Sequence, residues 1–368
     1  MELNAWQTLF AQQKDRYPLA RMQDLLKALH QSALGCGHLV ENEAGSFERL
    51  KKEWPSAPAA YPPEPLAGGF SRLHLGQARE VGLDPRTVQR LFTLSARVRT
   101  GQEAVFADIL REIRECPEVQ TLFADDADRA FLDGYIPRAP ALLSHSDIFR
   151  ENYRPAYRVI SDDLISLLPL CARIDRALAA SEKPLVMAVE GGCAGGKSTA
   201  AGILAAVYGA PVIHMDDFFL RPEQRTEDRY RTPGGNVDHE RFLLEAAPFL
   251  RAGQAFSYRK FDCARMALGE SVSVPASRLT VVEGSYSMHP ALSSLYGLSV
   301  FIETDLKTRK KRILRRNGDR AEQFFTLWMP LEDLYFDSTA ARQRCSMSLS
   351  FPDTPWNVLD FSGSGADE

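Results

Sequence analysis

The stretch Gly191-Gly192-Cys193-Ala194-Gly195-Gly196-Lys197-Ser198 decides how this sequence is interpreted. It matches the pattern G-x-x-x-x-G-K-[ST] at every fixed position. The apolar run Leu185–Val189 precedes it, and a helical pattern over Lys197–Tyr208 follows. Glycines let a backbone turn tightly and aim its N–H groups at phosphate oxygens, and the start of a helix adds the positive end of its dipole. The sequence therefore predicts a loop that binds the phosphates of a nucleotide.

Each residue type in this loop has a chemical reason. Lys197 can reach the β- and γ-phosphates, and the Ser198 hydroxyl can ligate Mg²⁺. We interpret Cys193 as a small filler rather than a nucleophile. The alternative is a glycine-rich turn without nucleotide, and the agreement of motif, strand and helix weighs against it. The predicted nucleotide-binding residues are Gly191, Gly192, Cys193, Ala194, Gly195, Gly196, Lys197, Ser198 and Thr199.

Strands and helices alternate on the C-terminal side of this loop. Further short apolar strands are expected at 211–214, 279–282 and 298–302, and a basic helix at 305–316. Such alternation predicts βαβ units, hence an α/β fold with a P-loop NTPase-type parallel sheet flanked by helices. Ligands then bind at the carboxyl ends of the strands.

Acidic residues follow two of the predicted strands. Asp216 comes directly after the second strand and can face the γ-phosphate across the loop, where it could accept the proton of an attacking hydroxyl and touch the metal. The alternative for Asp216 is a turn or capping acid. Glu283 follows the apolar run that ends at Val282 and is suited to the metal side of the site, or else it is a surface residue at a strand end.

Four segments occur in the order seen in the uridine kinase family, which this chain resembles over roughly residues 183–361. They are Gly191–Ser198, Met215-Asp216-Asp217-Phe218-Phe219, Val281-Val282-Glu283-Gly284 and Thr304-Asp305-Leu306-Lys307-Thr308-Arg309. The grouping includes nicotinamide riboside kinases, with pantothenate kinases and phosphoribulokinases more distant. The combination is specific for the kinase superfamily and does not name one substrate.

The resemblance implies roles for residues at matching positions. Asp216 matches the general base, Asp217 the second acid of the same element, and Glu283 the acid that binds Mg²⁺ directly or through water. Asp238 matches an acid that hydrogen-bonds ribose hydroxyls, and Tyr258 lies where the family contacts the nucleobase. From the residues alone, Asp238 could equally cap a helix, and Tyr258 could belong to a basic surface hairpin.

The basic helix at 305–316 matches the position of the family's lid. Phosphoryl transfer spreads negative charge over equatorial oxygens, which arginines can stabilise. The predicted lid residues are Arg312 and Arg316, with Arg320 as a further candidate. Other basic side chains in this run should be solvated, as charge runs usually are.

Composition excludes several classes of protein. The 368 residues carry 44 Lys and Arg against 48 Asp and Glu, a net charge of −4, which argues against a nucleic-acid binder held by bulk positive charge. No apolar run approaches the roughly 18 residues of a membrane-spanning helix. The N-terminus lacks the pattern of a secretory signal. Six scattered cysteines without a C-x-x-C pair indicate reduced thiols of a cytoplasmic protein.

Residues 1–180 are expected to form a mostly helical domain, and residues 181–368 the P-loop domain. Helical patterns run over 20–30, 85–98, 102–113 and 162–180, the last bent at Pro169, and a loop is expected at 55–69. Two segments carry chemistry: Gly35-Cys36-Gly37-His38-Leu39 and Ser144-His145-Ser146-Asp147. The first could be a catalytic or metal site and the second a polar site, but helix capping is the expected role of both.

A basic and aromatic segment follows the second of these. Arg150, Arg154 and Arg158 recur every four residues, with Tyr153 and Tyr157 among them. This cluster could bind a phosphorylated ligand or dock onto the kinase domain.

The sequence thus predicts an ATP- and Mg²⁺-dependent kinase whose acceptor is a hydroxyl of a small molecule, such as a nucleoside or another riboside. The alternative is a nucleotide-bound sensor whose helical half responds to ATP. A kinase acting on the ends of RNA or DNA is a third possibility, against which the acidic balance weighs. The acceptor, the choice between ATP and GTP, and the oligomeric state stay open.

Overall fold

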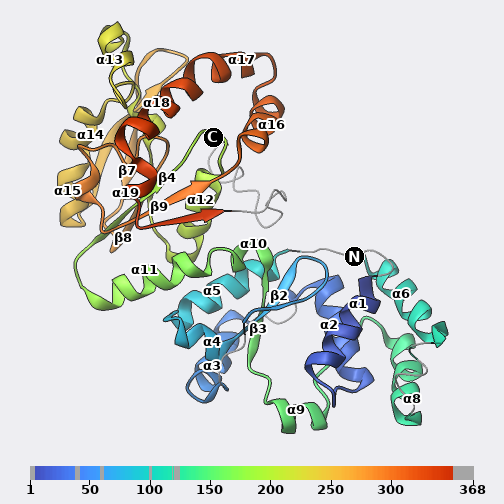
Figure 1. Cartoon of the computed structure of the whole chain (residues 1–368). Coiled ribbons are helices and arrows are strands. Elements are labelled where there is room, and N and C mark those ends of the chain that lie inside the picture. Colours follow the sequence, from blue (N-terminus) through green and yellow to red (C-terminus); the bar gives the residue numbers. More distant parts are fainter. Residues whose placement is uncertain are drawn as a thin grey trace. The chain divides into compact units, whose positions relative to one another are not determined.

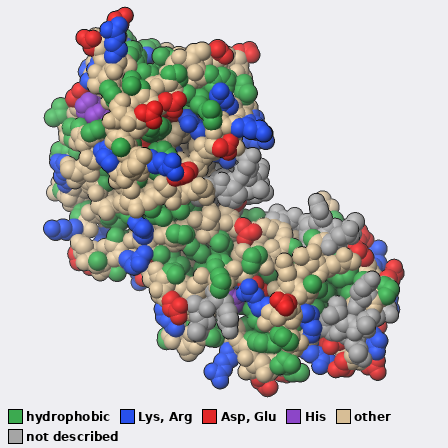
Figure 2. Space-filling model, viewed as in Figure 1, with side chains coloured by type: hydrophobic (Ala, Val, Ile, Leu, Met, Phe, Trp, Pro, Cys, Tyr) green, Lys and Arg blue, Asp and Glu red, His purple; other side chains and the backbone are tan. Residues whose placement is uncertain are grey.

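The structure is a computed structural model, and it describes residues 5–37, 42–58, 62–98, 102–117, 119 and 125–350. The chain divides into two compact units, with the boundary between Ala172 and Arg173 inside helix α11 (Leu168–Ala180). No described helix has the length and apolar character needed to cross a membrane. On the face in Figure 2, basic and acidic side chains are interspersed over both units rather than gathered by sign.

The C-terminal unit is built on a five-stranded parallel sheet, which confirms the predicted fold class (Figure 1). The four predicted strands are present, and a fifth strand, β10, was not predicted. In spatial order the strands are β10 (Met347–Ser350), β9 (Leu298–Glu303), β4 (Leu185–Glu190), β8 (Leu279–Glu283) and β5 (Val212–His214). Because β8 lies between β4 and β5, the ends of all three strands meet beside the P-loop.

Apolar residues on both faces explain why β4 and β8 lie inside the sheet. Every residue of both strands is buried, as is usual for parallel strands covered by helices. The helices of this unit are α12 (Lys197–Tyr208), α13 (Glu227–Arg231), α14 (His239–Glu245), α15 (Ala247–Ala252), α16 (Leu306–Asn317), α17 (Ala321–Gln323), α18 (Met329–Thr339) and α19 (Ala341–Arg344). A two-stranded antiparallel hairpin, β6 (Phe256–Asp262) and β7 (Ala267–Val274), completes it.

The N-terminal unit is mostly helical, as predicted. Its helices are α1 (Ala5–Arg16), α2 (Met22–Leu34), α3 (Glu43–Glu53), α4 (Leu75–Glu80), α5 (Pro85–Ala96), α6 (Glu103–Glu115), α8 (Asp126–Tyr135), α9 (Asp147–Tyr153) and α10 (Asp162–Ile165), followed by α11. The single bent helix expected at 162–180 is wrong: α10 and α11 are separate, and Pro169 occupies the second position of α11, where its missing N–H costs nothing.

An antiparallel sheet in the N-terminal unit was not predicted. It consists of β1 (Glu64–Pro65), β2 (Phe70–His74) and β3 (Tyr157–Ser161), with β2 in the middle. Part of the expected loop at 55–69 therefore belongs to this sheet. Polar residues of β2 and β3 are buried, Arg72 among them, which hides the alternation that marks a strand in sequence.

Candidate nucleotide-binding and phosphotransfer site

The P-loop joins the end of β4 to the start of α12. Gly191 and Gly196 have φ of +146° and +100°, a backbone region that other residues rarely adopt. At Gly195 the restriction is steric, because a Cβ there would lie 2.8 Å from the Gly192 carbonyl oxygen. These three glycines fix a loop whose N–H groups can converge on an anion.

Lys197 lies buried against the loop. Its Nζ donates hydrogen bonds to the Gly192 carbonyl, at 2.9 Å, and to Ser285 Oγ, at 3.3 Å. Two neutral oxygens thus accept hydrogen bonds from the ammonium group. Among the described residues, no carboxylate lies within hydrogen-bond distance of it. Thr199 is half-buried in the first turn of α12. The loop therefore carries a positive charge that no described carboxylate contacts directly, where phosphates would bind.

Glu283, at the end of β8, meets Ser198 and His214. Ser198 Oγ donates to Glu283 Oε1 at 3.1 Å, and His214 Nδ1 lies 2.5 Å from the same oxygen. Burial opposes ionisation of Glu283, but hydrogen bonds from His214 and Ser198 and the charge of Lys197 lower its pKa overall. The hydrogen bond to Glu283 raises the pKa of His214. Two hard oxygen donors, Ser198 and Glu283, therefore lie side by side at the loop.

These oxygens fit Mg²⁺ in the manner usual for phosphotransfer sites. Among the described residues no group of three or more His, Cys, Asp or Glu side chains could hold a metal alone. Mg²⁺ is commonly held by one or two protein ligands together with substrate phosphates and water. Ser198 and Glu283 would supply that protein share.

Asp216 and Asp217 lie in a 3₁₀ turn, Met215–Phe218, directly after β5. The Asp216 side chain reaches solvent, yet the surrounding protein desolvates it enough to raise the pKa of its carboxyl, and the nearby Glu283 charge adds to this while Lys197 opposes it. Its carboxylate is thus electrostatically coupled to both Lys197 and Glu283. Asp217 instead accepts a hydrogen bond from the Tyr258 hydroxyl at 2.6 Å.

Asp238 caps helix α14. Its carboxylate accepts the backbone N–H of Arg241 at 3.1 Å and Gln224 Nε2 at 3.0 Å, and the residue is 2% exposed. The structure confirms the helix-cap alternative, since both oxygens are engaged inside the protein. Tyr258 lies in the hairpin strand β6, but its side chain is 3% exposed and not at the surface, and its hydroxyl donates to Asp217.

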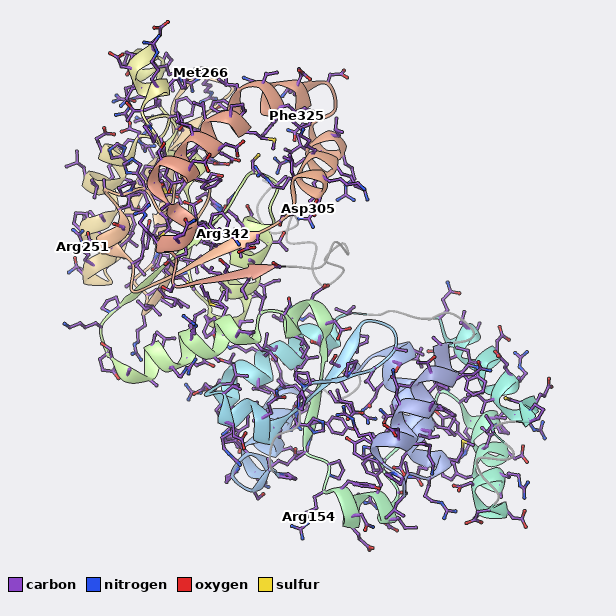
Figure 3. All side chains as sticks on the ribbon, viewed as in Figure 1. Arg154, Arg251, Met266, Asp305, Phe325 and Arg342 are labelled. Atoms are coloured by element: carbon purple, nitrogen blue, oxygen red, sulfur yellow. The ribbon has the colours of Figure 1, made fainter. Side chains whose placement is uncertain are left out.

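Of the arginines on α16 (Leu306–Asn317), where the sequence predicts a lid, Arg309 contacts the P-loop most directly. Its Nε donates to the Cys193 carbonyl at 2.9 Å, and a Cβ on Gly192 would lie 2.2 Å from its guanidinium carbon. Arg312 reaches the Ala194 carbonyl at 3.3 Å. Arg316 is exposed and lies over the Phe324 ring at 5.9 Å. Helix α16, which carries these residues, starts at the capping residue Asp305, labelled in Figure 3.

Glu332 was not predicted, although it contacts the loop directly. Both of its carboxylate oxygens accept the Cys193 N–H, at 2.9 and 3.0 Å, and it also accepts bonds from Arg309 at 2.7 Å and Ser285 Oγ at 2.6 Å. It is 3% exposed. Nothing in the local sequence around Glu332 marks it, because its partners come from three distant segments.

His214 was also not assigned a role from sequence. Its position at the end of a predicted strand, two residues before Asp216, was the available signal. Glu190, at the end of β4, is a second unassigned carboxylate. It accepts the N–H groups of Gly191 and Met288, and full burial raises its pKa to about 7.

The N-terminal candidates have structural partners. Gly35 ends α2 with φ +73°, and Ser146 caps α9 by accepting the Phe149 N–H at 3.2 Å, so both capping predictions are confirmed. Burial raises the pKa of the Cys36 thiol to about 12. His38 lies outside the described residues. All six cysteines are within the described part of the chain, and none forms a disulfide.

Comparisons with known proteins find likeness in structure alone. No family model matches the chain, and no curated protein matches it. A structure described as a possible uridine kinase from Bacillus stearothermophilus is similar over 49% of this chain and 98% of its own, with 17% identity and a TM-score of 0.39. A structure described as a putative fructose transport system kinase from Silicibacter shows 23% identity and a TM-score of 0.36, over 47% of this chain and 91% of its own. Shikimate kinase from Bacteroides thetaiotaomicron shows 12% identity over 47% of this chain and 91% of its own, with a TM-score of 0.25.

Proposed function

We propose that the chain is an ATP- and Mg²⁺-dependent phosphotransferase that moves a γ-phosphoryl group to a hydroxyl of a small molecule. The observation that carries the proposal is the juxtaposition at three strand ends. Lys197 of the P-loop, the Ser198–Glu283 pair and Asp216 all belong to one electrostatically coupled group. A loop that only binds nucleotide has no need for a free carboxylate opposite its lysine.

The residues divide the work as follows. The loop N–H groups and Lys197 hold the phosphates and neutralise charge that develops on the transferred group. Ser198 and Glu283 would hold Mg²⁺, which supplies further charge neutralisation when bound. Asp216 accepts the proton of the acceptor hydroxyl. Arg312, from the proposed lid helix α16, donates a hydrogen bond to the Ala194 carbonyl of the loop. Its other N–H groups can turn toward the phosphates.

The aromatic residues that follow Asp217 and those packed against them favour a planar, polar acceptor. Phe219 stacks with Trp328, at the end of the π-helical turn Phe324–Trp328, with 6.0 Å between ring centroids, and it meets Phe261 edge-on at 6.5 Å. Asp217 and Tyr258 add hydrogen-bonding groups beside them. Aromatic faces next to a carboxylate suit a nucleoside or another riboside with a primary alcohol.

A panel of acceptors tests this function. Purified protein, Mg²⁺ and γ-labelled ATP are incubated with nucleosides, riboside vitamins, pantothenate or glycerate, and transfer of label to the acceptor is measured. We expect labelled product and ADP release above the blank with at least one acceptor. ATP binding without transfer to any acceptor would instead support a nucleotide sensor.

A further inference from the structure

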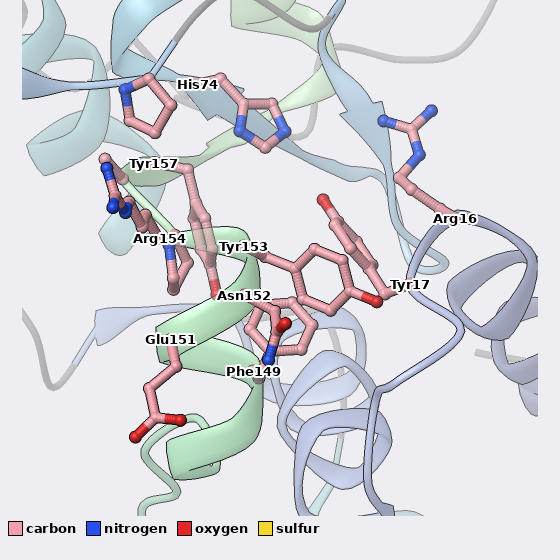
Figure 4. A pocket seen from close by; sticks show the side chains of 12 residues that line it. Arg16, Tyr17, His74, Phe149, Glu151, Asn152, Tyr153, Arg154 and Tyr157 are labelled. Carbon is pink, nitrogen blue, oxygen red and sulfur yellow. The ribbon is translucent and has the colours of Figure 1, made fainter.

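A cavity of about 560 Å³ lies within the N-terminal unit (Figure 4). Its floor is formed where β2 and β3 pair, with His74 opposite Tyr157 in the register. Residues around the end of α9, including Tyr153 and Arg154, form one side, and the end of α1 with Tyr17 forms another. Cavities of several hundred Å³ are the usual size for small-molecule sites.

Aromatic rings line much of this cavity. Tyr17 and Tyr153 meet edge-on with centroids 5.0 Å apart, and His74 and Tyr157 do so at 6.1 Å. Figure 4 shows these rings around a common space rather than packed into one stack. Ring faces and edges arranged in this way suit a planar apolar group.

Two arginines give the cavity a positive charge. Arg154 is exposed, and its side chain forms no hydrogen bond or ion pair with any described residue. Arg16 lies 4.0 Å from the Glu64 carboxylate and is 36% exposed. In Figure 4 the two guanidinium groups lie on opposite sides of the cavity, while the Glu151 carboxylate points away from it. A ligand in this space would meet more positive than negative charge.

The backbone at Arg154 has a conformation that is unusual for a residue with a side chain. Arg154 has φ +44° and ends α9 in the left-handed conformation that glycine adopts most easily. The chain thus places a cation where helix termination alone would favour glycine. Arg150, one turn earlier, is exposed and paired with Asp147, and Arg158 is buried and paired with Glu53, so the three arginines do not form one cluster.

Buried polar groups hold the lining residues from behind. Glu64 is 2% exposed and accepts hydrogen bonds from Tyr17 at 2.7 Å and from Arg72 at 2.9 Å. The Tyr157 hydroxyl lies 2.6 Å from His145 Nε2, whose other ring nitrogen is 2.8 Å from Asp24. Burial of these charged groups carries a desolvation cost that apolar side chains would not have. In return, the network fixes the residues that line the cavity, as a preorganised binding site requires.

We propose that this cavity binds a small organic anion, with its phosphoryl or carboxyl group at Arg154 and a planar apolar group among Tyr17, Tyr153 and Tyr157, while Arg16 adds positive charge from the opposite side. The site belongs to the N-terminal unit alone. It is independent of the phosphotransfer proposal, which concerns residues of the other unit.

Isothermal titration calorimetry on the full chain tests the proposal with phenyl phosphate, benzoate and phenol as probes. We expect saturable binding of phenyl phosphate or benzoate, and the tighter of the two identifies the anionic group. Phenol, which lacks the anion, should bind at least about tenfold more weakly, because it forms no charge-assisted bond. Equal affinity for phenol, or no saturable binding of either anion up to about 10 mM, would overturn the proposal.

Paired arginine variants locate the binding. Arg154→Gly removes the cation and leaves a backbone that glycine adopts easily, so it should keep the melting temperature while weakening anion binding about tenfold or more. Arg150→Ala, the matched control on the same helix, should leave the affinity within about twofold. Anion binding of wild-type strength in Arg154→Gly would place the bound probe elsewhere, for example at the P-loop, and would overturn the assignment.

Discussion

The Glu332 carboxylate accepts the backbone N–H of Cys193 with both oxygens, at 2.9 and 3.0 Å. Because Glu332 lies on α18, this contact attaches that helix to the P-loop. The same carboxylate forms a buried ion pair with Arg309 of helix α16. The Glu332 side chain therefore connects the P-loop, helix α16 and helix α18. This contact makes the loop geometry depend on residues far along the chain.

Glu332→Ala should strongly destabilise the protein. It leaves the Arg309 guanidinium, the Cys193 N–H and the Ser285 hydroxyl without their shared acceptor, and breaking a buried ion pair typically costs about 3–5 kcal/mol. The free energy of unfolding, measured by urea denaturation, checks this. Glu322→Ala is the matched control, because Glu322 is exposed, and it should change stability by less than about 0.5 kcal/mol. Equal stability of the two variants would show that the Glu332 contacts contribute nothing.

Glu64→Ala should destabilise the N-terminal unit for the same physical reason. Arg72 is 1% exposed, and removal of Glu64 leaves its charge buried without a carboxylate. A loss of about 3–5 kcal/mol is expected on urea denaturation. Glu48→Ala removes an exposed partner of Lys51 and should cost about 0–1 kcal/mol. A similar small loss in Glu64→Ala would contradict the account of this buried network.

His214→Gln should move the acid limb of the pH profile of kcat/KM to higher pH. The hydrogen bond with Glu283 raises the pKa of His214, which favours its charged form. Desolvation raises the pKa of Asp216 above its ordinary value, and the positive charge of His214 opposes that rise. A general base works only when it is deprotonated. Loss of the His214 charge should therefore raise the pH at which activity appears. Rates measured from acid to neutral pH follow the limb.

Arg251→Gln is the control for the loss of a positive charge. Arg251 is exposed on α15 (Figure 3), and its removal should leave the limb in place. An acid limb that stays fixed, or moves to lower pH, in His214→Gln would mean that the limb does not report Asp216.

Local patterns were sufficient to predict the centre of the P-loop unit. The glycine spacing at 191–198, the apolar runs before it and after it, and the acids at 216 and 283 are all short-range features of strand, turn and helix. The parallel sheet followed from their alternation. The positions of Lys197, Ser198 and Glu283 at one sheet edge agree with what that topology requires.

The remaining features depend on contacts between distant segments. Strand β10 alternates apolar and polar residues over only four positions, which is a short signal, and β2 buries polar side chains such as Arg72, which hides its alternation. Glu332 meets Cys193 across 139 residues, and charge alone did not separate Arg309 from its basic neighbours on α16. Tertiary partners decide these roles, and a single sequence does not display them.

The central claim is that Asp216 takes the proton of the acceptor hydroxyl opposite a triphosphate held by Lys197. The most direct measurement compares wild type with Asp216→Asn for both ATP binding, by calorimetry, and phosphoryl transfer, in single turnovers with the best acceptor of the panel. We predict ATP affinity within about threefold of wild type and transfer slowed about 10²–10⁴-fold, the usual contribution of a general base. The exposed Asp228→Asn should match wild type in both. Transfer at the wild-type rate in Asp216→Asn would contradict the account.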